Sequence, residues 1–207
     1  MSAAPDAAPT HDGLDPRARE VLDFWFGLPG SAEFGYERKM WFRKDGAFDA
    51  RLRERFGALL DAACAGELDA WCATPEGALA LVIVLDQFSR NCHRGTPRAF
   101  SSDDKALGIA RAMLASGADR HLPSPHHRVF AYLPFEHAES AEAQRESLRL
   151  FGELAHDDPQ CKGYYDYALR HAAVIERFGR FPHRNVQLGR TTTRDEAAFL
   201  REPGSSF

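Results

Sequence analysis

The segment Thr74-Pro-Glu-Gly-Ala-Leu-Ala-Leu-Val-Ile-Val-Leu85 decides the fold of this chain. Threonine followed by proline is typical of a helix start, because the hydroxyl caps free backbone N–H groups and proline fits the first helical position. From Leu79 to Leu85 every residue is apolar, so this helix has no polar face to turn toward water. We therefore expect it to lie at the centre of a helical bundle.

Helix signals also dominate on both sides of this segment. Start signals, stop glycines and apolar residues at helical spacing predict helices at about 16–26, 46–65, 103–116, 141–156 and 160–178. A further helix starts at Ser124-Pro125, and we expect Pro134 to kink or end it. The pattern Thr193-Arg-Asp-Glu196 is a capping box for a short last helix. No segment alternates as a strand does, so the sequence predicts an all-α fold.

The length and charge of the chain limit what it can be. Its 207 residues predict a single helical domain over residues 14–207, behind an Ala/Pro-rich leader, residues 1–13, which we expect to be disordered. A formal net charge of -4 argues against a nucleic-acid binder or a protein of anionic membranes. The longest apolar run, residues 78–85, is far too short to span a bilayer. We expect a cytoplasmic protein.

The sequence predicts no metal site and no cofactor. The four cysteines, Cys64, Cys72, Cys92 and Cys161, lack the short spacing of a zinc site or a redox dithiol, and we expect reduced, mostly buried thiols. The histidines likewise lack the spacing of a helical zinc or di-iron site. Walker, dinucleotide and nucleophile-elbow glycine patterns are absent from the chain.

The stretch Arg177-Phe-Gly-Arg-Phe-Pro-His-Arg-Asn185 indicates a local cationic site. Five arginines and no acidic residue lie between Arg177 and Arg194 of this acidic protein. Such a group suits an anion, which is either a bound ligand or a buried carboxylate of the protein itself. The candidate ligand-binding residues of this stretch are Arg177, Arg180, Arg184 and Asn185, with His183 as a candidate acid/base residue.

Asp86 lies in the apolar helix one turn before Arg90, so the two side chains face each other. In one interpretation they form a structural ion pair at the helix end. In the other, Asp86 is a general base or a ligand contact, and Arg90 lowers its pKa. Asn91 and Arg94 follow directly and join the candidate ligand-binding set.

The segment Tyr132-Leu-Pro-Phe-Glu-His137 contributes a second acid/base group. A carboxylate beside an imidazole suits proton transfer near neutral pH, and we select Glu136 as catalytic and His137 as ligand-binding. Neighbouring positions on a helix point about 100° apart, so the two need not share a target. The alternative is a capping glutamate and a histidine at the core edge. We expect His171, on a largely apolar helix, to be a core residue.

These motifs together resemble the DUF924 family, proteins of unknown function with a tetratricopeptide-like helical fold. The resemblance runs from Val21 to the C-terminus, and the matching pieces include Leu85-Asp-Gln-Phe-Ser-Arg-Asn91, Arg94-Gly-Thr-Pro-Arg-Ala-Phe100, Tyr132-Leu-Pro-Phe-Glu-His137 and Arg177-Phe-Gly-Arg-Phe-Pro-His-Arg-Asn185. It implies a tetratricopeptide-like bundle or solenoid of antiparallel helix pairs. It implies no activity.

The sequence therefore leaves two functional hypotheses open. In the first, the polar segments converge on a concave site where Arg90, Arg180 and Arg184 grip a small anionic molecule, with hydrolase or lyase chemistry if the protein is an enzyme. In the second, the chain is a helical-repeat module for a protein or peptide partner, and the same residues are internal struts. A ligand site leaves arginines partly open in a pocket, whereas struts are buried and paired. The sequence predicts no oligomeric state.

Overall fold

The computed structural model describes residues 13–205 of the chain, so residues 1–12 of the expected leader lie outside the described residues. Within 13–205 the protein is all-α, with no strand, and the predicted fold class is confirmed. None of these helices is both long enough and apolar enough to cross a membrane. The α-helices are α1 (Pro16–Phe26), α2 (Gly46–Ala65), α3 (Pro75–Val82), α4 (Ser89–Cys92), α5 (Asp103–Ser116), α6 (Pro125–His137), α7 (Ala141–Asp157), α8 (Lys162–Phe178) and α9 (Arg194–Phe199).

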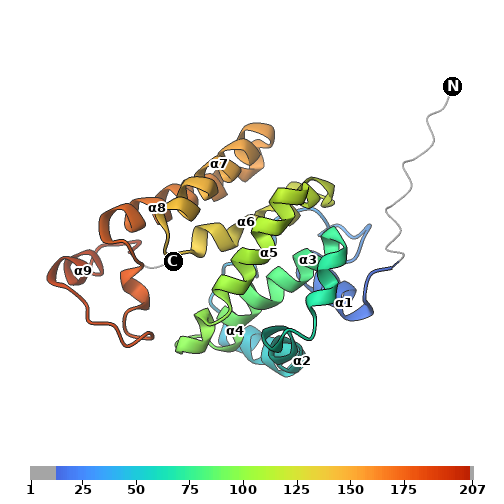
Figure 1. Ribbon diagram of the computed structural model, residues 1–207, viewed down its shortest axis with the longest axis horizontal. Coiled ribbons are helices and arrows are strands. Elements are labelled where there is room, and N and C mark those ends of the chain that lie inside the picture. The colour runs from blue at the N-terminus through green and yellow to red at the C-terminus, as the bar shows by residue number, and fades with distance from the viewer. Residues whose placement is uncertain (1–12, 206–207) are drawn as a thin grey trace.

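The central helix is the predicted one, and it continues further than its apolar run. Thr74 caps its start, with Oγ1 accepting from Gly77 N at 3.1 Å. α3 passes without a break into a π-helical turn, η2 (Ile83–Phe88), and then into α4. Every residue from 77 to 89 is buried, because α3 and η2 pack against α1, α2, α5 and α6 (Figure 1). π-helical turns inside α-helices are frequent at functional sites.

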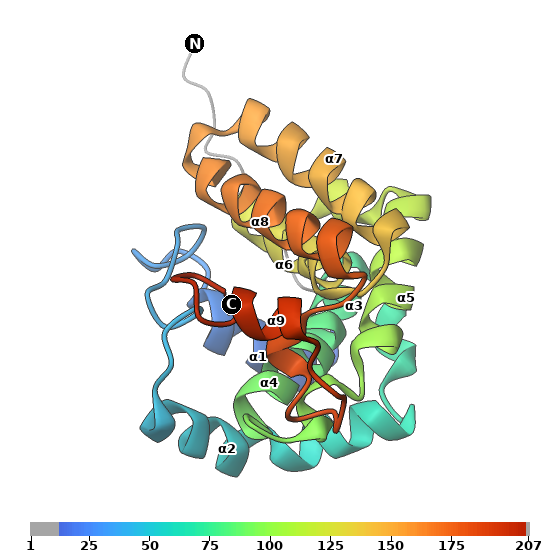
Figure 2. The same ribbon diagram turned by 90° about the vertical axis from the view of Figure 1, so that its left-hand side faces the viewer.

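The second half of the chain adds a helical hairpin. α7 and α8 pack along each other, joined by a short 3₁₀ turn at Pro159–Cys161, and both contact α6 (Figure 2). A tetratricopeptide-like superhelix of such pairs stays a prediction. After α8 the chain turns back through the 3₁₀ turn Pro182–Arg184 to α9. The other 3₁₀ turns are Asp69–Ala73, Pro97–Phe100 and Ala118–His121.

A small second core fixes the returning C-terminal segment. Val174, Ile175 and Phe181 are buried together, and Phe178 and Phe199 pack against them. The large first core, which runs from α1 to α8, is separate from it. The segment that carries most of the arginine-rich stretch is thus held by a few aromatic contacts and by the polar bonds described below.

Two details differ from the sequence expectations. Of the two outcomes predicted for Pro134, a kink or a helix end, the helix end is wrong, because α6 continues to His137 and so places Glu136 and His137 in its last turn. Only two of the four thiols, Cys92 and Cys161, are buried, while Cys64 and Cys72 are exposed. Their spacing in sequence carried no information about which helix face each would occupy.

Substitution of Gly77 tests how closely the start of the central helix packs against the backbone at Trp71. A Cβ atom there would collide with the Trp71 carbonyl oxygen and lie 2.8 Å from Thr74 Oγ1. We expect Gly77→Ala to lower the free energy of unfolding by about 1–3 kcal/mol, although alanine favours helices. Gly108→Ala in α5, where nothing lies within 4 Å of the added atom, should instead be neutral or stabilising. Urea unfolding of both variants measures the difference, and equal effects would contradict the packing.

Candidate functional site

The centre of the candidate site is Asp86, a carboxylate in the π-helical turn whose side chain is 1% exposed. Gln87 Nε2 donates to its Oδ2 at 2.6 Å, while His137 Nδ1 and Arg90 Nη1 lie 2.8 Å and 3.0 Å from its Oδ1. Burial by itself raises the pKa of a carboxyl group, but Arg90 and His137 outweigh burial and hold the pKa of Asp86 below its ordinary value. Asp86 is therefore ionised at neutral pH.

Asp103, the first residue of α5, links two arginines from distant parts of the chain. Arg90 donates to it twice, from Nη1 to Oδ1 at 2.9 Å and from Nη2 to Oδ2 at 3.0 Å. Arg184 Nη1 donates to Oδ2 at 3.2 Å. Two carboxylates and two guanidiniums thus balance one another in the protein interior. We call these four residues and their neighbours the Asp86 cluster, which comprises Asp86, Arg90, Asp103, Glu136, His137, His171 and Arg184.

Arg184 is the only member of the arginine-rich stretch that the described structure places in this cluster. Its guanidinium lies 4.7 Å from the ring centroid of Phe100 and 4.7 Å from that of Phe181. Burial, and then the charge of Arg90, lower its pKa to about 10, so it stays protonated at neutral pH. Nη2 donates to the carbonyl oxygen of His137 at 3.0 Å, where the C-terminal end of α6 favours a cation. Nε is buried without a hydrogen-bond partner among the described residues.

The last turn of α6 presents Glu136 and His137 to different neighbours. Glu136 turns toward α8 and His137 toward the central helix, as expected for consecutive helical positions. The carbonyl oxygens of this turn need external donors, because a helix end has no internal ones. Gln144 Nε2 provides them, donating to Phe135, Glu136 and Ala138 at 3.3, 2.7 and 2.9 Å. These bonds hold the last turn of α6 in its helical form, and the helical backbone then sets the directions of the Glu136 and His137 side chains.

The protonation of His137 follows from its contacts. Since Asp86 is ionised and can only accept, Nδ1 of His137 carries the hydrogen and donates it. Burial, and then the charge of Arg90, lower the pKa of His137, so the ring is neutral near pH 7 and Nε2 holds a lone pair. Nε2 forms no hydrogen bond with a described residue, and the side chain keeps 14% of its surface exposed. A carboxylate that orients a histidine in this way makes Nε2 a proton acceptor, the arrangement used in catalytic triads.

Glu136 and His171 form a neutral pair beside this dyad. Nδ1 of His171 lies 2.9 Å from the carbonyl oxygen of Tyr167 and 3.2 Å from Glu136 Oε1. Burial, and then the charge of Asp86, raise the pKa of Glu136 to about 8. Burial, and then the charge of His137, lower the pKa of His171 to about 3. At neutral pH the two groups are therefore a carboxylic acid and a neutral imidazole, and not an ion pair.

His183 lies at the edge of the cluster, in the 3₁₀ turn that also carries Arg184. Its ring centroid is 5.6 Å from that of Phe181. Burial, and then the charge of Arg184, lower its pKa to about 4. Phe181 also lies 5.5 Å from the ring centroid of His171, so it connects His183 with the cluster. The two candidate acid/base residues, Glu136 and His183, thus lie around the same group of charges as His137.

Asn91 and Arg94 lie on the other side of the central helix. Asn91 Nδ2 donates to Asp49 Oδ1 at 2.8 Å, and Arg94 donates from Nε to Oδ2 at 2.7 Å and from Nη2 to Oδ1 at 3.0 Å. Burial opposes ionisation of Asp49, but these bonds outweigh it and hold its pKa below the ordinary value. The contact fastens the end of α4 to α2, apart from the Asp86 cluster.

Arg180 and Asn185 belong to a network around Glu196 in α9. Arg180 donates from Nε to Oε1 at 2.7 Å and from Nη2 to Oε2 at 3.0 Å, and Asn185 Nδ2 donates to Oε2 at 3.2 Å. Arg190 Nε donates to Asn185 Oδ1 at 3.0 Å and reaches Glu139 with its Nη atoms at 2.6 and 2.9 Å. The predicted capping box, with Glu196 at its third position, is confirmed. Glu196 thus closes the C-terminal segment upon itself, while Glu139 ties the segment to the turn between α6 and α7.

Arg177 differs from the other arginines of the predicted set. It is exposed at the end of α8 and forms no ion pair with any described residue. Its guanidinium lies 4.7 Å from the ring centroid of Phe178 and 5.8 Å from that of Phe199. It lines a surface pocket with Arg180 and does not contact the Asp86 cluster.

Sequence reasoning missed the carboxylates that pair with these arginines: Asp49, Asp103, Glu139 and Glu196. Asp103 follows two serines and reads as the acidic first turn of a helix, and Glu196 reads as part of a capping box. Both have those local roles, and both also bind an arginine far away in sequence. No local pattern distinguishes such a residue, because the partner comes from another helix.

Among residues 13–205, no group of three or more His, Cys, Asp or Glu side chains has the arrangement needed to hold a metal ion. The histidines of the Asp86 cluster are instead engaged with carboxylate or carbonyl oxygens. The described site contains an Asp–His dyad, two arginines, a second carboxylate and a protonated glutamate.

Comparison with known families identifies the chain. The family model "Bacterial protein of unknown function (DUF924)" matches residues 21–204. The chain belongs to the DUF924 family. The resemblance carried by the motifs from Val21 onward is confirmed. No curated protein matches this DUF924 protein.

A solved structure is similar to this DUF924 protein over nearly its whole length. It is the structure of a protein of unknown function, ATU0120, from Agrobacterium tumefaciens. The two chains are 39% identical and superpose with a TM-score of 0.78, over 89% of this chain and 97% of the other. The match supports the all-α fold and brings no activity with it.

The paired and unpaired arginines should differ strongly in their effect on stability. Arg90→Gln leaves the buried Asp86 and the partly exposed Asp103 with less positive charge, so we expect a loss of about 3–5 kcal/mol in the free energy of unfolding. Arg177→Gln removes an exposed guanidinium and should cost about 1 kcal/mol or less. Denaturant unfolding compares them. Similar losses would show that Arg90 is not held in the interior as described.

The raised pKa of Glu136 predicts a pH dependence. The folded state keeps its proton up to about pH 8, while the unfolded state releases it near the ordinary value of 4.5, so stability falls between these pH values. Glu136→Gln removes this contribution, and the slope of the free energy of unfolding against pH should become flatter by roughly 1 kcal/mol per pH unit. Glu176→Gln, an exposed change on α8, is the control. Parallel curves for Glu136→Gln and the wild type between pH 5 and 8 would contradict this assignment.

Proposed function

We propose that this DUF924 protein binds a small acidic molecule at His137 and exchanges a proton with it, the chemistry of a hydrolase or a lyase. The observation that supports the proposal best is the Asp86–His137 dyad. Asp86 fixes Nδ1 as the donor, and Nε2 keeps its lone pair without a partner among the described residues. Perturbed titratable groups with a specific charge partner are typical of functional sites.

The proton transfer itself is simple. An O–H group of the ligand, either of a phosphate monoester or a hydroxyl, donates to Nε2. The new N–H bond forms as the O–H bond breaks, and the electron pair remains on the ligand oxygen. The product is an imidazolium between Asp86 and the ligand anion, with Arg90 and Arg184 nearby in the same cluster. These charges favour a ligand whose reactive form is an anion.

Glu136 and His183 take supporting roles in this proposal. Glu136 is protonated at neutral pH and is a candidate proton donor, while His183, which is neutral at that pH, lies at the cluster edge. The positive charges of the arginines stabilise the bound anion electrostatically, without direct hydrogen bonds to it. Arg90, Arg180 and Arg184 each bind a carboxylate of the protein.

That same pairing favours a second candidate function. Arg90, Arg94, Arg180, Arg184 and Arg190 are all bonded to carboxylates of the protein, as expected of internal struts. The protein would then be a helical module for a protein or peptide partner, and the Asp86 cluster would only specify how its helices pack.

Thermal unfolding with a panel of small anions tests the first function. The panel contains inorganic phosphate, glycerol 3-phosphate, acetate and citrate, measured with the wild type and His137→Gln. A ligand present at 100 times its dissociation constant stabilises by about 2.7 kcal/mol. We expect one class of anion to stabilise the wild type and not His137→Gln, whereas His156→Gln, an exposed change on α7, should keep the response.

A second measurement covers the case in which His137→Gln does not fold. Bound anion next to Nε2 should raise the pKa of His137, which ¹⁵N NMR of the wild-type imidazole detects. An unchanged His137 titration with every anion, together with no thermal shift, would refute the proposed function and favour the helical module.

A further inference from the structure

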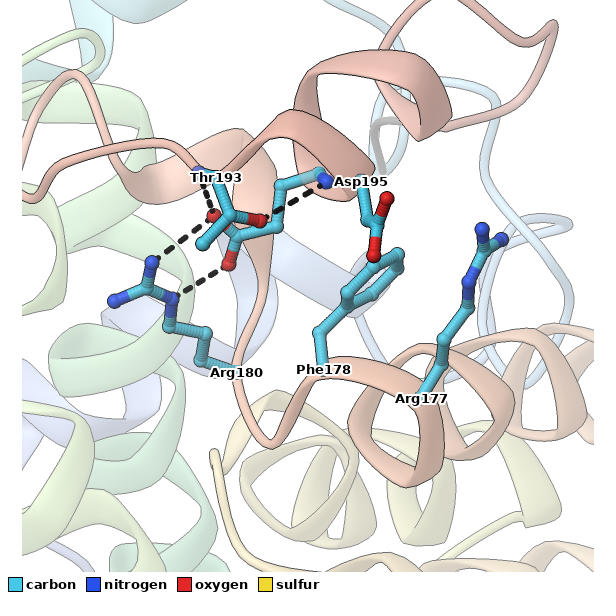
Figure 3. A pocket seen from close by; sticks show the side chains of 6 residues that line it. Arg177, Phe178, Arg180, Thr193 and Asp195 are labelled. Carbon is cyan, nitrogen blue, oxygen red and sulfur yellow. Dashed lines mark hydrogen bonds and ion pairs between the residues drawn. The ribbon is translucent and has the colours of Figure 1, made fainter.

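A pocket of about 390 Å³ lies where the end of α8 faces the start of α9 (Figure 3). Small-molecule pockets typically measure about 300–1,000 Å³, so this one suits a small metabolite. It is lined by Arg177, Phe178, Arg180, Thr193, Asp195 and Glu196. None of these residues belongs to the Asp86 cluster.

One charged pair of the pocket is already satisfied. Arg180 binds both oxygens of Glu196, and Glu196 Oε2 also accepts from Thr193 N at 2.7 Å. Arg180 Nη2 donates further to the carbonyl oxygen of Thr191 at 2.9 Å. Figure 3 shows the bonds among Arg180, Thr193 and Glu196 as one wall of the pocket. This wall has a structural role, and these bonds leave only Nη1 of the Arg180 guanidinium outside them.

The two remaining charges are of opposite sign and are not paired. Arg177 and Asp195 line the same pocket, yet neither forms an ion pair or a side-chain hydrogen bond with any described residue. In Figure 3 the Asp195 carboxylate is drawn directly above the ring of Phe178, with Arg177 to the right of both. That ring lies 5.2 Å from Phe199, so the aromatic surface next to the two charges is held in place.

We infer that this pocket binds a free α-amino acid with an apolar or aromatic side chain. Its carboxylate would accept from the guanidinium of Arg177, and its ammonium group would donate to Asp195. Its side chain would pack on Phe178. A simple anion would meet the repulsion of Asp195 and a simple cation that of Arg177, so a zwitterion is the ligand that satisfies both groups. The site is separate from His137 and does not depend on the proposed function.

Three related compounds test the assignment by calorimetry or NMR titration. L-Phenylalanine carries both charges, N-acetyl-L-phenylalanine lacks the ammonium group and L-phenylalaninamide lacks the carboxylate. We expect the wild type to bind phenylalanine at least about tenfold more tightly than either derivative, about 1.4 kcal/mol. Arg177→Gln should abolish the advantage over the amide, and Asp195→Asn the advantage over the N-acetyl compound.

Matched variants show whether binding depends on the position of these two charges or only on the net charge of the protein. Arg170→Gln and Asp166→Asn make the same charge changes at exposed positions of α8 outside the pocket, and both should bind phenylalanine as the wild type does. His137→Gln should also keep this binding. The inference is overturned by absence of saturable binding, by equal binding of all three compounds, or by binding that survives both pocket variants. Binding lost only in His137→Gln would overturn it too, and would place the ligand at the dyad.

Discussion

A single buried carboxylate organises most of the polar interior of this protein. Asp86 directly follows a helical run, residues 78–85, that is apolar on every side, and burying an unpaired charge there would cost several kcal/mol. The charge is tolerated because Arg90, Gln87 and His137 reach it from three directions. Arg90 in turn requires Asp103, and Asp103 recruits Arg184 from a segment 81 residues further along the chain. The end of α6 and the arginine-rich stretch are thus positioned by their links to one side chain.

The main effect of such a network is to specify which helices pack together, and its effect on the stability of the fold is smaller. Exchanging a well-paired buried ion cluster for apolar residues is often neutral or stabilising, so stability alone does not account for it. Two features of the Asp86 cluster are not needed to pack the helices together. His137 offers an unpaired nitrogen beside a partly exposed edge, and Glu136 keeps its proton at neutral pH. Groups held in these states are suited to proton transfer, which is why the dyad, and not the arginines, carries the proposed function.

The C-terminal segment has a different character. It packs on a small aromatic core of its own, and its charges are closed by Glu196 and Glu139. Arg177 and Asp195 stand out from this closed network, because each retains an exposed charge at the rim of a pocket. The two proposed ligand sites are therefore chemically distinct: a buried acid/base dyad and an open pocket of mixed charge. Membership of the DUF924 family and the similarity to ATU0120 establish the fold that holds both.

The sequence by itself determined the helices and the central position of one of them. Capping residues, stop glycines and apolar periodicity are local signals, and the predicted helices agree with the structure apart from the end of α6 and the π-helical turn. The pair Asp86–Arg90 was also readable, since both lie on one helix. The sequence could not show that His137 orients on Asp86, that Asp103 joins Arg90 to Arg184, or that Asn91 and Arg94 point to Asp49. These contacts link different helices, and only the packing of the helices sets the distance between their side chains. Local patterns fix which residues are helical, whereas the tertiary structure decides which charges meet.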